Sequence, residues 1–95
     1  MIDLARFDEG ESGRTRLFDD PVTVRLDLDA GTSIPPHRHP ERRVVVAVLD
    51  GTLEVTVGDA TETVEEGRTA RFPGSEDISL VAETDTLGIL VLADA

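Results

Sequence analysis

Two histidines, His37 and His39, have a spacing that allows them to act on one chemical group. They are separated by a single residue within the proline-rich segment from Ile34 to Pro40, which favours an extended backbone. Side chains two positions apart on an extended chain project from the same face, so both imidazoles can point into one cavity. Imidazole nitrogens bind divalent metal ions, and the pair therefore predicts a metal site.

Two histidines alone hold a divalent ion only loosely, because a catalytic metal site usually has three protein ligands and an open position. Glu41, two residues after the second histidine, is the predicted third protein ligand. Glu76, Asp77, a water molecule or a residue of a second subunit are alternatives. Without a metal, the histidines would be solvent-facing loop residues, hydrogen-bonding groups that orient a ligand, or an acid and a base.

Other reactive chemistry has little support in the sequence. The absence of cysteine excludes disulfides, thiolate nucleophiles and cysteine-based metal clusters. There is no Gly-rich phosphate loop, nucleophile elbow or HExxH pattern. The acidic runs at residues 8–11 and 62–66 are expected to be solvated turns, since nothing nearby gives two carboxylates contrasting environments. Arg42 and Arg43 are expected on a solvated rim, with orientation of a carboxylate ligand as the alternative.

Alternation of apolar and polar residues with a period of two recurs between Val22 and the C-terminus, which predicts an all-β fold. The run from Val44 to Leu49 is apolar throughout and predicts a strand buried on both faces. Asp50-Gly51 then predicts a hairpin turn into the strand Thr52 to Val57. Other strands are predicted at residues 22–29, 61–65, 68–72, 78–82 and 87–92, a spacing typical of a barrel or sandwich.

The segment from Gly31 to Gly51 resembles the first sequence motif of the cupin superfamily. That motif reads glycine, five residues, His-x-His, three or four residues, glutamate, six residues and glycine. Gly31, His37, His39 and Gly51 fall in register with it when the spacer has four residues. Val44 then stands at the position of the glutamate, so the third metal ligand of the motif is missing.

A weaker resemblance to the second cupin motif follows, with Gly67 and Pro73 in register but Ser75 and Ile78 in place of its glycine and histidine. Together the resemblances imply a small single-domain cupin with a degenerate metal site, folded as an antiparallel β-barrel or jelly roll. They imply His37 and His39 as ligands of a divalent metal that activates oxygen or acts as a Lewis acid. The implied reactions are those of a dioxygenase, an isomerase or a related enzyme of small molecules.

Apolar residues at the two missing ligand positions predict an apolar pocket. Its predicted lining residues are Val44, Val46, Val48, Phe72 and Ile78. Such a pocket would favour a hydrophobic or aromatic small molecule, with the histidine pair as its polar handle. The alternative is that these residues simply form a packed core.

The length of 95 residues predicts one domain, with an N-terminal arm at residues 1–20 and a β-barrel at residues 21–95. No long apolar segment occurs near the N-terminus, and a cytoplasmic location is expected. So small a core favours a homodimer. The second apolar face of the Val44 to Leu49 strand would be covered by the partner, or alternatively by Leu17 and Phe18 of the arm.

Twenty acidic residues against nine arginines, with no lysine, give a formal net charge of −11. A surface of this charge repels nucleic acids and anionic membranes, and neither is expected as a partner. Proteins of halophiles have similar surfaces, because high salt screens their self-repulsion. A high-GC genome would explain the missing lysine equally well.

The first hypothesis for function is a small cupin-like protein that binds a divalent metal weakly through the histidine pair and binds or transforms a small-molecule ligand. A metal-free ligand-binding or regulatory module without catalysis is the alternative. A structural partner of another protein is the third reading, since one fold hosts many functions.

Overall fold

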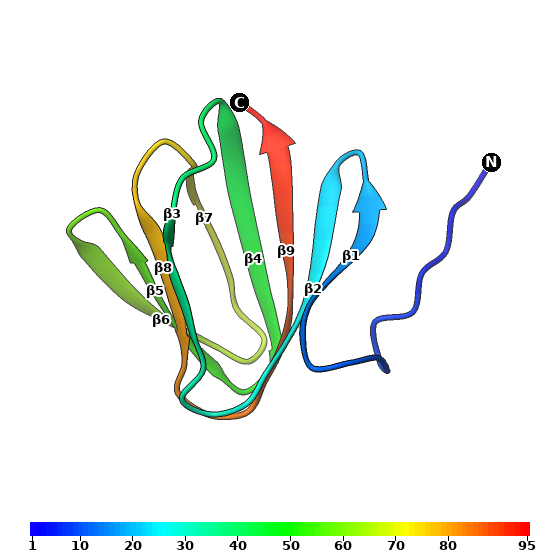
Figure 1. Cartoon of the computed structure of the whole chain (residues 1–95), viewed down its shortest axis with the longest axis horizontal. Helices are drawn as coiled ribbons and strands as arrows, with labels where there is room; N and C mark the ends of the chain where they lie inside the picture. The colour runs from blue at the N-terminus through cyan, green and yellow to red at the C-terminus, as the bar shows by residue number, and fades with distance from the viewer.

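The computed structural model describes residues 1–95 and contains nine strands and no helix (Figure 1). The strands are β1 (Gly13–Asp19), β2 (Val22–Leu28), β3 (Ser33–His37), β4 (Arg42–Asp50), β5 (Thr52–Val57), β6 (Ala60–Glu65), β7 (Thr69–Pro73), β8 (Ile78–Ala82) and β9 (Thr86–Asp94). One sheet has the order β1-β2-β9-β4-β7 and the other β3-β8-β5-β6. No segment forms a helix with the length and hydropathy needed to cross a membrane.

All strand pairs are antiparallel, and the two sheets face each other without being hydrogen-bonded into a closed barrel. The prediction of an all-β jelly roll is therefore confirmed. Strand β3, in the proline-rich segment, was not predicted as a strand. It pairs with β8 through an irregular register, because two prolines cannot donate backbone hydrogen bonds to a ladder.

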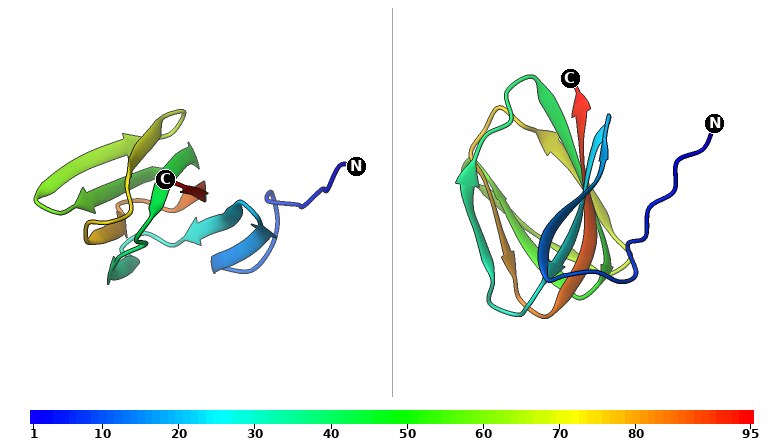
Figure 2. Two further views of the ribbon diagram at one scale, coloured as in Figure 1. Left: turned by 90° about the horizontal axis from the view of Figure 1, so that it is seen from above. Right: turned by 45° about the vertical axis from the view of Figure 1, so that its right-hand side comes forward.

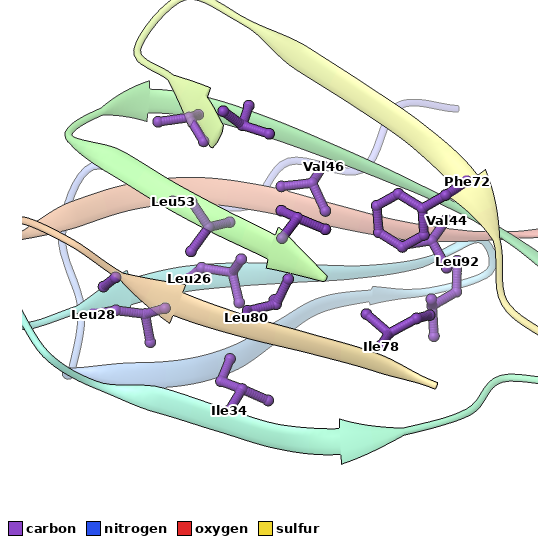
Figure 3. Packing of buried hydrophobic residues seen from close by; sticks show 14 residues of the cluster. Leu26, Leu28, Ile34, Val44, Val46, Leu53, Phe72, Ile78, Leu80 and Leu92 are labelled. Carbon is purple, nitrogen blue, oxygen red and sulfur yellow. The ribbon is translucent and has the colours of Figure 1, made fainter. Parts of the chain in front are cut away.

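The core fills much of the space between the sheets (Figure 3). Every strand except β1 contributes to it, because alternate residues of each strand point inward. Its fourteen buried residues are Leu26, Leu28, Ile34, Val44, Val46, Val48, Leu53, Val55, Val64, Phe72, Ile78, Leu80, Ala82 and Leu92. Burial of these side chains is the main source of stability in a chain without disulfides.

The predicted hairpin at Asp50-Gly51 is wrong. Strand β4 pairs with β7 and β9, whereas β5 pairs with β6 and β8, so the chain crosses here from one sheet to the other. Gly51 has a φ of 91°, and a Cβ atom on it would lie 2.2 Å from the carbonyl oxygen of Asp85. The glycine thus permits a tight crossing between the two sheets. A hairpin turn also favours glycine, so the two have the same signal in the sequence.

The predicted arm at residues 1–20 includes β1, which pairs with β2 at the edge of the larger sheet. The segment before β1 is fastened by Arg25, whose side chain is buried on the outer face of β2. Its guanidinium donates hydrogen bonds to the carbonyl oxygens of Phe7 and Glu11 and pairs with Asp27 at 3.2 Å. The first residues of the chain project away from both sheets, as Figure 2 shows.

Strand β4 is fully buried on one face only. Val44, Val46 and Val48 face the core, while Val45 and Ala47 are half-buried and Leu49 is 44% exposed. The arm strand β1 is separated from β4 by β2 and β9 in the same sheet, so it does not cover this outer face. Burial of β4 on both faces, expected from its composition, is therefore incomplete in the single chain.

Candidate functional site

A cavity of about 400 Å³ lies between β1, β2 and β9 of the larger sheet and β3 and β8 of the smaller one. Its wall is mostly apolar, with polar groups from β1 and from the end of β3. The lining residues are Arg14, Arg16, Val22, Val24, Leu26, Ile34, His37, His39, Leu80, Leu90 and Leu92. An apolar enclosure with a few polar groups is the usual form of a small-molecule site.

The two predicted histidines lie together in this lining. His37 is the last residue of β3, and His39 follows in the loop before β4. Their ring centroids are 4.6 Å apart and the ring planes are nearly perpendicular, at 84°. Both imidazoles therefore lie at one cavity, as the spacing of the two histidines predicts.

The tautomer of His37 is fixed by its own backbone. Its Nδ1 lies 3.0 Å from the carbonyl oxygen of Pro35, and a carbonyl can only accept, so Nδ1 carries the proton in this contact. The lone pair of the neutral ring is then on Nε2. A hydrogen bond of this kind orients the imidazole for a metal ion or for a ligand donor.

His39 is held by the turn between β7 and β8. Its backbone N–H donates to the carbonyl oxygen of Gly74 at 2.8 Å, and a Cβ atom on Gly74 would approach the His39 carbonyl oxygen to 2.4 Å. Burial lowers the pKa of His39, and electrostatic repulsion from His37 and Arg42 lowers it further. The ring is therefore neutral at neutral pH, with a free lone pair.

No third metal ligand joins the histidine pair, and nowhere does the chain bring three His, Asp or Glu side chains together as a metal-binding group. Glu41 is exposed, with a φ of 63°, and does not line the cavity. Asp77 is engaged by Arg38, which pairs with it at 2.6 Å and lowers its pKa. The carboxylate of Glu76 lies beside Gly58, where a Cβ atom would be 3.2 Å from Oε2.

The five residues predicted to line a pocket lie elsewhere. Val44, Val46, Val48, Phe72 and Ile78 belong to the buried core and are not part of the cavity wall. Their burial agrees with the alternative hypothesis, in which these residues form a packed core. Four other core residues do border the cavity, namely Leu26, Ile34, Leu80 and Leu92.

Sequence reasoning missed the arginines of the site. Arg14 and Arg16 lie on β1, opposite Leu26 and Val24 of β2, which also line the cavity. The period of two in Arg14-Thr15-Arg16 was the available signal, but only the pairing of β1 with β2 determines which face these side chains occupy. Arg42, in contrast, turns toward Asp94 at 3.3 Å and lies outside the cavity lining.

The all-β architecture agrees with the comparison to known proteins. Residues 24–92 match the family described as the cupin domain. The chain belongs to the cupin family. This match covers most of the chain, including all strands from β3 to β8. No curated protein matches the sequence.

Several solved structures resemble this cupin. An RmlC-like cupin from Desulfovibrio desulfuricans is 25% identical with a TM-score of 0.77, over 98% of this chain and 92% of that one. A conserved protein of unknown function from Streptococcus pyogenes is 27% identical with a TM-score of 0.73, over 78% of this chain and 64% of that one. This cupin thus covers less than two thirds of the Streptococcus protein.

A predicted oxalate decarboxylase from Thermotoga maritima has a TM-score of 0.81 to this cupin. The alignment covers 98% of this chain and the whole of that one, but the two are only 16% identical. This likeness establishes the fold alone, because one fold supports many unrelated chemistries.

Proposed function

We propose that this cupin binds a small molecule in the cavity between β1, β2, β9, β3 and β8, and that His37 and His39 hold a divalent metal ion only weakly. The observation that carries the proposal is an apolar cavity in which two neighbouring imidazoles have no third protein ligand. The cavity volume of about 400 Å³ lies within the range of small-molecule sites, roughly 300–1,000 Å³.

The donor set supports a weakly held ion. Both imidazoles offer a lone pair, from Nε2 of His37 and from the neutral ring of His39. At the position of the motif's glutamate, however, Val44 is 1% exposed and contributes no donor. A site with two protein ligands leaves most of the coordination shell to water or to the bound molecule. A divalent ion there would supply Lewis-acid chemistry.

Metal titration by calorimetry, on protein purified without a histidine tag, tests this part of the proposal. We expect weak binding of nickel, copper, zinc or manganese that is lost in His37→Ala and in His39→Ala. Glu41→Gln and Asp77→Asn are matched controls, because they remove carboxylates that lie outside the cavity lining. Tight binding that Glu41→Gln abolishes would contradict the proposal and restore Glu41 as a ligand.

A metal-free binding or regulatory module is the second candidate function, and the apolar residue at position 44 favours it. In this case His37 and His39 act as hydrogen-bonding groups for the ligand. The same titration separates the two candidates, because this module binds none of the four metals. Small-molecule binding in the cavity is common to both.

The proposed assembly is a homodimer. The outer face of β4 leaves Leu49 exposed, and the other exposed large apolar side chains are Met1, Ile2 and Leu4 of the arm. In a dimer, the arm of each copy would cover the outer face of β4 in the other. Burial of the apolar side chains of the arm and of this face would add stability to a small core. Light scattering at micromolar concentration should give the mass of a dimer in low and high salt. A monomer mass in both would contradict the assembly.

A further inference from the structure

We infer that the ligand of the cavity is a monocarboxylate with an apolar body, and that Arg14 and Arg16 bind its carboxylate. The inference rests on the proposed ligand-binding function and specifies the chemical class of the ligand. It arises from two arginines on one strand, from the composition of the cavity wall, and from the charge of the rest of the chain.

The strand register points both arginines toward the cavity. In β1, Arg14 is opposite Leu26 and Arg16 is opposite Val24, and both partners on β2 face the interior. The residue between them, Thr15, is opposite Arg25, which lies on the outer face. Since successive side chains of a strand alternate between faces, the two guanidiniums share the inner side of the sheet edge.

These guanidiniums are available for a ligand. Arg14 makes no ion pair or side-chain hydrogen bond in the structure, and Arg16 has one ion pair, to Asp19 at 3.5 Å. In that pair the side chains are 61% and 89% exposed, so it contributes little to stability and competes weakly with a ligand. By contrast, Arg25, Arg38 and Arg42 each have a partner at 3.3 Å or less.

The cavity wall differs in charge from the chain as a whole. Aspartate and glutamate make up twenty of the 95 residues, yet none of them lines the cavity. The four polar residues of the wall are two arginines and two histidines. The cavity is therefore a local region of positive charge on a molecule with a net charge of −11, and an apolar wall strengthens its attraction for an anion.

The remainder of the wall determines the body of the ligand. Seven hydrophobic residues from β2, β3, β8 and β9 enclose the space beside the arginines. They provide no hydrogen-bonding side chains for a polyhydroxylated or highly charged body. The chain also has no helix, so it lacks the helix N-terminus that commonly binds phosphate. A planar carboxylate on an alkyl or aryl group matches both the guanidinium fork and the apolar wall.

Calorimetric titrations with octanoate and phenylacetate, each paired with its primary amide, test the inference. The amide keeps the shape of the acid and removes its charge. We expect each carboxylate to bind about tenfold more tightly than its amide, because hydrogen bonds to charged groups are the stronger ones. Arg14→Gln combined with Arg16→Gln should abolish this preference and leave the affinity for the amide unchanged. Phenyl phosphate, used as a competing anion, should bind more weakly than phenylacetate.

Arg68→Gln combined with Arg71→Gln is the matched control. Both arginines are exposed and lie outside the cavity lining, so this variant has the same change of net charge. The preference for carboxylates should survive in it. Equal affinity for acid and amide, an equal loss in the control, or tighter binding of phenyl phosphate would overturn the carboxylate inference while leaving the proposed function intact. Failure of all the acids and amides to bind would count against both.

Discussion

The space between the two sheets has two regions with opposite properties. Beneath β4 and β7, Val44, Val46 and Phe72 are buried in a packed core (Figure 3). Between β1, β2 and β9 and the facing β3, the space is hollow and is bordered by arginines and histidines. Residue 44 lies in the packed region, although the cupin motif has a metal-binding glutamate there. An apolar residue at this position therefore removes a ligand and also fills the space around it, leaving the polar groups on the β1 side.

The largest expected effect comes from placing a carboxylate in the packed region. Val44→Glu without metal should lower the free energy of unfolding by about 3–5 kcal/mol, the usual cost of an uncompensated buried charge. If position 44 faces the histidines, a metal bound by all three residues will restore much of this loss. Melting temperatures with chelator and with nickel, copper, zinc or manganese measure both effects.

Val44→Gln is the control for that experiment, since glutamine is similar in size to glutamate but has no carboxylate to bind a metal. Its melting temperature should not respond to metal. If Val44→Glu also melts no higher with any metal than with chelator, residue 44 does not face the histidines and the motif register is incorrect.

Truncation of one leucine in each region gives a second, smaller contrast. Leu53→Ala, in the packed core, should lower the free energy of unfolding by about 2–5 kcal/mol, because it leaves a closed void. Leu90→Ala should cost about 1–2 kcal/mol, since Leu90 is half-buried and already borders the cavity. Urea unfolding measures both values. Equal losses would show that the cavity is closed by packing in solution.

The smallest expected effect concerns the protonation of His39. Its lowered pKa means that the folded protein disfavours the charged ring. The associated stability is therefore present above the ordinary pKa of 6.5 and is lost as the pH falls through the folded value. An NMR titration of the imidazole with chelator present measures the shift. His37→Gln should raise the pKa more than Arg42→Gln does, and a wild-type value at or above 6.5 would contradict the site geometry.

Strand patterns in the sequence were sufficient for most of the fold. The strands Thr52–Val57 and Ile78–Ala82 occur with the predicted bounds. The first of them alternates strictly between polar and apolar residues, which indicates a half-buried strand directly. The crossing at Gly51 was misassigned, since a glycine with positive φ serves a hairpin and a change of sheet equally well. The local sequence does not distinguish a hairpin turn from a change of sheet, because the two differ only in which strands pair.

The site was predictable only in part for the same reason. The spacing of His37 and His39 was enough to bring them to one cavity, because extended residues two apart share a face. Arg14 and Arg16 could not be assigned to that cavity, since this depends on the pairing of β1 with β2 and on the facing of two sheets. Val44 and Ile78 could be expected inside, but whether they line a pocket or fill a core depends on packing.

An NMR titration of methyl-labelled protein with octanoate tests most directly whether the hollow region is the ligand site. The account predicts that the methyl signals of Val22, Val24 and Leu90 shift in a saturable manner, since all three line the cavity. The signals of Val46 and Leu53, within the packed core, should remain in place. Saturable shifts confined to the core, or to Val45 and Ala47 on the outer face of β4, would contradict the assignment of the cavity as the binding site.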